Sequence, residues 1–161
     1  MSDFARKHAE LIRYTRQQRE EEENRLKKLR EAIAEEDKLK AKLGPELWLQ
    51  FKLLIASKCR EVNNELDEEY YEVSDSVPDE LQITKSSPHV SLVLKYYRTN
   101  HSISFKGGRC NGEYLLGIAE GTREAILTDA SDKLKRSMDL EATAEFLLTD
   151  CFEKLRSTAT S

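Results

Sequence analysis

The chain has 161 residues and a mass of 18.6 kDa, the size of one domain with an appendage. Its formal net charge of −4 is unevenly divided. Residues 1–43 carry 12 Lys and Arg against 10 Asp and Glu, whereas the rest of the chain carries 14 against 20. Affinity for phosphate comes from clustered Lys and Arg, so the acidic remainder is a poor general binder of polyanions.

The sequence shows neither membrane spans nor secretion signals. No apolar stretch approaches the ~20 residues that span a bilayer. The N-terminus carries Asp3 and Glu10 and has no apolar segment of the kind that a signal peptide needs. The cysteines Cys59, Cys110 and Cys151 are odd in number and share no CxxC spacing, which is typical of reduced thiols. We therefore expect a cytoplasmic protein.

Residues 1–43 are predicted to form one long charged helix, an arm attached to a folded domain. The first helix-breaking residues in the chain are Gly44 and Pro45, and more than half of the residues before them are charged. We interpret this pair as a hinge between the arm and a compact domain at 44–157. The final residues, 158–161, are expected to be a flexible tail.

An apolar stripe gives the arm a surface for interaction. The heptad pattern in its second half is interrupted by Glu36 and Lys40, leaving fewer than two clean heptads where a sustained coiled coil needs about three or four. A helix is therefore predicted, and coiled-coil pairing is left open. The candidate interaction residues of the arm are Leu11, Ile12, Leu26, Leu29, Ile33, Leu39 and Leu43.

The first part of the arm is basic. Residues 4–19 contain five Lys and Arg against one Glu, a composition compatible with contact to an anionic membrane or a nucleic acid. The stripe is short, however, and the acidic run Glu20–Glu23 follows at once, which favours a self-pairing or partner-docking helix. The candidate anion contacts are Arg6, Lys7, Arg13, Arg16 and Arg19.

The compact domain is predicted to begin and end with a helix. Apolar residues recur at helical spacing from Pro45 to about Asn64, and again after Asp139, which is a suitable N-cap. The apolar positions are Trp48, Phe51, Ile55, Cys59, Val62 and Leu66 in the first helix, and Leu140, Ala144, Leu147, Cys151 and Leu155 in the second.

Between these helices the apolar period changes to two, which predicts five or six strands between Tyr70 and Leu127. Because the connections are short, the strands are expected to pair antiparallel as a meander. The predicted fold class is therefore α+β: a long charged helix, then a helix, an antiparallel sheet and a helix, with both helices of the domain on one face of the sheet. Apolar residues expected on the open face are Val93, Tyr97, Leu115 and Ile126.

No residue pattern indicates catalysis or metal binding. The three histidines lack HxxxH spacing, so no zinc site is predicted. Cys110 lies in the sequence KGGRCNG, where Lys106 and Arg109 could favour a thiolate, but nucleophilic catalysis also needs a base and an orienting group. Whether Cys110 is reactive is left open. The glycines of this segment connect two strands instead of leading into a helix, which favours a hairpin over a phosphate-binding loop.

These observations predict a non-catalytic protein-interaction or assembly module whose long helix oligomerises or docks on a partner. The expected partner is a protein, with a homo-oligomer favoured. The alternative is a protein that contacts anionic membranes or nucleic acid through residues 4–19. No cofactor, metal or small-molecule substrate is inferred.

Overall fold

The computed structural model describes residues 2–86 and 89–153. The chain divides into two units, residues 1–38 (unit 1) and residues 39–161 (unit 2). Predictions that fall on Leu155 and on residues 158–161 lie outside the described residues. The elements in chain order are α1 (Asp3–Leu66), β1 (Tyr71–Ser74), β2 (Glu80–Ser86), β3 (His89–Tyr97), β4 (Ser102–Gly107), β5 (Cys110–Ile118), β6 (Ala125–Asp129), β7 (Ser137–Met138) and α2 (Leu140–Phe152).

The α+β class is confirmed. The seven strands form one antiparallel sheet in the order β1-β2-β3-β4-β5-β6-β7, so every strand pairs with its neighbour in the chain. Five or six strands were expected from the period of two. The seventh, β7, has only two residues and pairs Met138 with Leu127, and so short a strand cannot display alternation.

The helix is not interrupted at Gly44 and Pro45, so the prediction of a hinge that separates two helices is wrong. Pro45 lies inside α1, and Gly44 is buried. An ideal Cβ built on Gly44 would lie 2.3 Å from the hydroxyl oxygen of Tyr96 and 3.0 Å from a methyl carbon of Leu116. Gly44 therefore allows the helix to lie close to the sheet, and its role is packing instead of helix termination.

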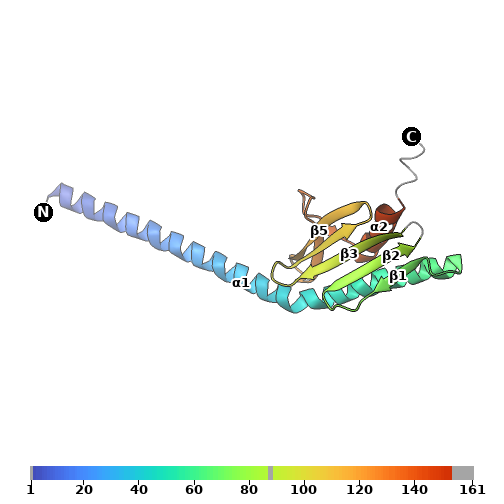
Figure 1. Ribbon diagram of the computed structural model, residues 1–161. Helices are drawn as coiled ribbons and strands as arrows, with labels where there is room; N and C mark the ends of the chain where they lie inside the picture. The colour runs from blue at the N-terminus through green and yellow to red at the C-terminus, as the bar shows by residue number, and fades with distance from the viewer. Residues whose placement is uncertain (1, 87–88, 154–161) are drawn as a thin grey trace, which may run out of the picture. The chain divides into compact units, whose positions relative to one another are not determined.

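The part of α1 in unit 2 packs on one face of the sheet together with α2 (Figure 1). Trp48 stacks on Tyr96 at a ring-centroid distance of 5.8 Å, and Phe51 meets Tyr114 edge-on at 6.3 Å. From α2, Phe152 contacts Tyr71 at 5.3 Å. Both helices thus cover the same face, as predicted. The core they form includes Leu47, Trp48, Phe51, Ile55, Cys59, Leu81, Ile83, Leu92, Leu94, Ile103, Leu127, Ala144, Leu147, Cys151 and Phe152.

Local hydrogen bonds fix the end of α1 and the start of α2. At the end of α1, Asp67 adopts a left-handed conformation (φ 57°), and its N–H donates to the Asn64 carbonyl oxygen at 3.3 Å. The Asn63 side chain both donates to and accepts from the Tyr71 backbone at 2.8 Å, which joins this helix end to β1. At the start of α2, the Asp139 carboxylate accepts from the Glu141 N–H at 3.0 Å, so the predicted N-cap is confirmed.

Candidate interaction surfaces

The predicted interaction residues within unit 1 are mostly solvent-exposed. The exposed fractions are 59% for Leu11, 39% for Ile12, 50% for Leu29 and 52% for Ile33, while Leu26 is half-buried. The described residues of unit 1 form a single helical segment, so they include no second element against which these side chains could be buried. An apolar surface without an internal partner is the main feature of this unit.

Side-chain contacts show which residues share one face of this segment. The rings of Phe4 and His8 stack at 5.3 Å, and the Thr15 hydroxyl donates to the Leu11 carbonyl oxygen at 2.9 Å. Positions three and four apart lie on the same face of a helix. We define the arm stripe as the residues at this spacing in the two halves of unit 1: Phe4, His8, Leu11, Thr15, Leu26, Leu29 and Ile33.

The middle of the arm stripe is charged. Glu22 lies at the stripe spacing between Thr15 and Leu26, and one of its carboxylate oxygens is 2.6 Å from an Arg25 guanidinium nitrogen. The hydrogen bond from Arg25, together with its positive charge, lowers the pKa of the Glu22 carboxyl. The stripe therefore has two apolar ends separated by an ionised, exposed centre.

The last two predicted arm residues, Leu39 and Leu43, belong to unit 2 and are half-buried. Leu43 and Leu47 line a shallow hollow of about 460 Å³, together with Arg123, Glu124 and Ala125 from the β5–β6 turn and the start of β6. The surroundings of Leu43 are thus those of the domain, unlike the exposed leucines of unit 1.

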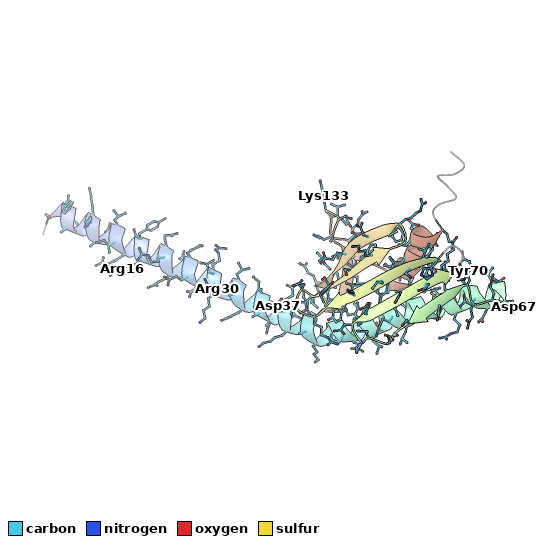
Figure 2. The ribbon with its side chains drawn as sticks, viewed as in Figure 1. Arg16, Arg30, Asp37, Asp67, Tyr70 and Lys133 are labelled. Carbon is cyan, nitrogen blue, oxygen red and sulfur yellow. The ribbon has the colours of Figure 1, made fainter. Side chains whose placement is uncertain are left out.

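The five candidate anion contacts are exposed on α1 but are spread around the helix. Arg6 is paired with Asp3 at 2.5 Å, whereas Lys7, Arg13, Arg16 and Arg19 form no ion pair within the part of the chain that the structure describes. At about 100° per residue, Arg6 and Arg13 share one side, and Lys7 faces another. Figure 2 shows long side chains projecting from the helix, Arg16 and Arg30 among them. These cations do not form one concentrated patch.

The four residues expected on the open face of the sheet do share that face, but they do not form one exposed patch. Leu92 and Leu94 are buried toward the helices, so Val93 points to the opposite side. The register aligns Tyr97, Ser102, Leu115 and Thr128 in one cross-strand row, and Ile126 lies beside this row, opposite Gly117. Of the four candidates only Tyr97 is exposed, at 43%, and Val93 pairs with Lys106 of β4.

The sequence analysis did not predict several exposed apolar side chains on the two helices of unit 2. Leu49 and Leu53 are 51% and 61% exposed on the side of α1 that faces away from Phe51 and Ile55, and Phe146 is 47% exposed on α2. The spacing of four between the two leucines was visible in the sequence. The stronger stripe through Phe51 and Ile55 took precedence over it.

Two lysine side chains of unit 2, Lys85 and Lys58, form ion pairs that connect different elements. Lys85 is 7% exposed, and its ammonium nitrogen lies 3.1 Å from a Glu153 carboxylate oxygen and 5.3 Å from the centre of the Tyr70 ring. The Tyr70 hydroxyl donates to the same carboxylate at 2.6 Å. Its hydrogen bond with Tyr70 and its pairing with Glu153 raise the pKa of Lys85, so the amine stays protonated and is a charge partner, not a base.

The ion pairs of Lys58 connect the two helices of unit 2. The Lys58 ammonium nitrogen lies 2.8 Å from a Glu141 oxygen and 3.1 Å from a Glu145 oxygen.

Among the described residues, no group of three or more His, Cys, Asp and Glu side chains is arranged to hold a metal ion.

The fold and these surfaces define an α+β domain, built from a helix, an antiparallel meander and a second helix, whose first helix also forms unit 1. No family model, curated protein or solved structure matches the chain. None of the described helices combines the length and apolar character that crossing a membrane requires.

Proposed function

We propose that the protein is a non-catalytic assembly module that self-associates through the arm stripe of unit 1. The observation that carries this proposal is the exposure of Leu11, Leu29 and Ile33, each half or more exposed on a helical segment without a partner inside its unit. Burying a Leu or Ile side chain fully is worth about 1.5–3 kcal/mol. Pairing with a second copy supplies this burial at several positions at once.

The spacing of the arm stripe favours antiparallel pairing of two copies. When two identical helices cross antiparallel at the point between positions 18 and 19, residue pairs whose numbers add to 37 lie opposite each other. Phe4 then faces Ile33 of the second copy, His8 faces Leu29, and Leu11 faces Leu26. Each apolar end of the stripe therefore meets the other apolar end.

The distribution of charge favours the same arrangement. Residues 1–19 carry five Lys and Arg against two Asp and Glu, a net of +3, and residues 20–38 carry five against eight, a net of −3. Antiparallel pairing sets each basic half against an acidic half. Parallel pairing would set Glu20–Glu23 against its own copy and Glu22 against Glu22 at the centre of the stripe, which like-charge repulsion disfavours.

Polar substitutions in the arm stripe test this proposal. We expect Leu26→Gln combined with Leu29→Gln to weaken self-association of the full chain by about a hundredfold or more, because two leucines are lost from each copy. Gln has nearly the helix propensity of Leu, so the helix itself is preserved. Sedimentation equilibrium or light scattering over a concentration series measures the change.

Leu53→Gln is the matched control, because Leu53 is an exposed leucine of the same helix but lies in unit 2. We expect it to leave the association constant unchanged. A fragment that begins at Leu39 should be monomeric. Equal oligomeric states for the full chain and this fragment would contradict the proposal.

Charge reversal tests the antiparallel orientation. Replacing Arg13, Arg16 and Arg19 by Glu sets acidic halves against acidic halves, and we expect association to weaken at least about tenfold, since exposed ion pairs contribute 0.2–1 kcal/mol each. Replacing Glu20, Glu21 and Glu22 by Lys should have a similar effect. Both replacements in one chain should restore association. In a parallel dimer each position faces the same position of the other copy, so either single replacement leaves like charges facing like charges. Unaltered affinity after these replacements would therefore refute the antiparallel orientation.

The alternative function, contact with anionic membranes or nucleic acid, predicts different results. Binding to anionic vesicles or to a nucleic-acid column would weaken steeply with salt, because exposed charges are screened over about 10 Å at 0.1 M. It would be lost with the Arg13, Arg16 and Arg19 reversal while the Leu26 and Leu29 variant retained it. Retention of the full chain on such a surface at low salt would favour this alternative over self-association.

A further inference from the structure

The two cysteines Cys110 and Cys151, distant in sequence, come from elements that meet in unit 2. Cys110 is the first residue of β5 and is half-buried against the core, directly after the turn that leaves β4. Cys151 lies in the last turn of α2 and is 1% exposed. Both are free thiols.

Backbone contacts place the β4–β5 turn against the end of α2. The Arg109 N–H donates to the Cys151 carbonyl oxygen at 3.3 Å. An ideal Cβ on Gly108 would lie 2.5 Å from that same oxygen, so the approach depends on the missing side chain of this glycine. Because Cys110 directly follows Arg109, its side chain begins within one residue of this contact.

The side-chain environment shows that the two thiols are neighbours. Burial raises the pKa of the Cys151 thiol, and a side-chain hydrogen bond with Cys110 raises it further. Burial raises the pKa of the Tyr114 hydroxyl, and Asp129, Cys151 and Cys110 raise it further, so both thiols lie near this hydroxyl. Cys59 provides a contrast, because burial alone raises its pKa to about 12 and no other thiol takes part.

We propose that Cys110 and Cys151 are a modification site at which a low-molecular-weight disulfide, such as oxidised glutathione, forms a reversible intramolecular disulfide. This inference goes beyond self-association and does not depend on it. The site combines a half-buried thiol at the start of β5 with a buried thiol in the last turn of α2, and a covalent bond between them would reinforce the contact that the Arg109 N–H already makes.

The reaction has two exchange steps. The Cys110 thiol loses its proton to solvent, and its sulfur attacks one sulfur of oxidised glutathione, releasing one glutathione thiolate and leaving a mixed disulfide on Cys110. Cys151 then loses its proton, and its sulfur attacks the Cys110 sulfur and releases the second glutathione. The two protein thiols are oxidised and the glutathione disulfide is reduced to two thiols. Because burial keeps Cys151 protonated, the second step is the slow one and accelerates as pH rises.

The experiment uses the full chain, reduced, desalted and incubated with oxidised glutathione. Intact-mass analysis should show the loss of two hydrogens, and peptide mapping after alkylation should link Cys110 to Cys151 while Cys59 remains alkylatable only after unfolding. Dithiothreitol should reverse the change. We expect the oxidised form to melt several degrees higher than the reduced form, because the bond links two elements across 41 positions of sequence.

Two variants sharpen the result. Cys110→Ala should form no intramolecular bond, and Cys151→Ala should stop at the glutathione adduct on Cys110. If the substitution of the buried Cys151 prevents folding, peptide mapping of the unsubstituted chain and of Cys110→Ala still shows whether Cys110 and Cys151 form the disulfide. A persistent adduct on Cys110 in the unsubstituted chain, a bond that involves Cys59, or oxidation only between two chains would overturn the proposal.

Discussion

Trp48→Ala is expected to lower the free energy of unfolding of unit 2 by ~3–5 kcal/mol, the range for removing an aromatic side chain from a packed core. Trp48 is 2% exposed and stacks on Tyr96, and its indole N–H donates to the Pro78 carbonyl oxygen at 3.1 Å. The substitution therefore removes both a large apolar surface and a hydrogen bond to the loop before β2. Such a loss is a large part of the roughly 5–15 kcal/mol that stabilises a typical domain.

Urea unfolding followed by circular dichroism measures this effect, since Trp48 is the only tryptophan in the chain and its fluorescence is lost with it. Leu49→Ala is the matched control, because Leu49 is the next residue on the same helix and is 51% exposed. We expect that variant to change the free energy of unfolding by less than about 1 kcal/mol. Equal effects of the two substitutions would show that Trp48 does not anchor the core.

Gly107→Ala is expected to destabilise unit 2 by roughly 2–6 kcal/mol, combining backbone strain with a steric clash. Gly107 has a φ of 130°, a conformation that residues with a Cβ rarely adopt. A Cβ on Gly107 would lie 2.0 Å from the Ser91 carbonyl oxygen. That oxygen cannot easily move away, because it also accepts the Gly108 N–H at 2.9 Å.

Gly121→Ala separates the two contributions. Gly121 also has a positive φ, 86°, but an added Cβ there meets no atom within 4 Å. We expect it to show the strain alone, with a loss of about 1–3 kcal/mol. If both alanine variants lose the same free energy in thermal or urea unfolding, the Ser91 strand accommodates the extra carbon and the clash does not exist.

The sequence predicted the parts of the fold that are encoded by local periodicity. Alternation predicted five or six of the seven strands, and the spacing of Trp48, Phe51, Ile55 and Cys59 identified the buried face of α1. The hinge at Gly44 was wrong, because the reason for that glycine lies in another element: the helix approaches Tyr96 more closely than a side chain permits. Local sequence does not reveal which residue of the sheet will oppose a glycine.

The candidate surfaces could likewise be predicted from the sequence only where a single element determines them. The residues of the arm stripe could be found from spacing alone, because a single helix determines which of them share a face. The adjacency of Cys110 and Cys151 could not, because it depends on how the β4–β5 turn meets the last turn of α2. The rows of the open sheet face required the register, which places Tyr97 and Leu115 on either side of Ser102.

The lengths of the strands limit how copies of this domain can associate. The strands at the two edges of the sheet are the shortest, with four residues in β1 and two in β7, whereas the interior strands β3 and β5 have nine each. Unpaired backbone N–H and C=O groups along a sheet edge are templates for strand addition and aggregation, and short edge strands restrict both. Edge-to-edge growth of the sheet is thereby disfavoured, so the self-association proposed for the arm stripe would not compete with an open-ended mode of assembly through the strands.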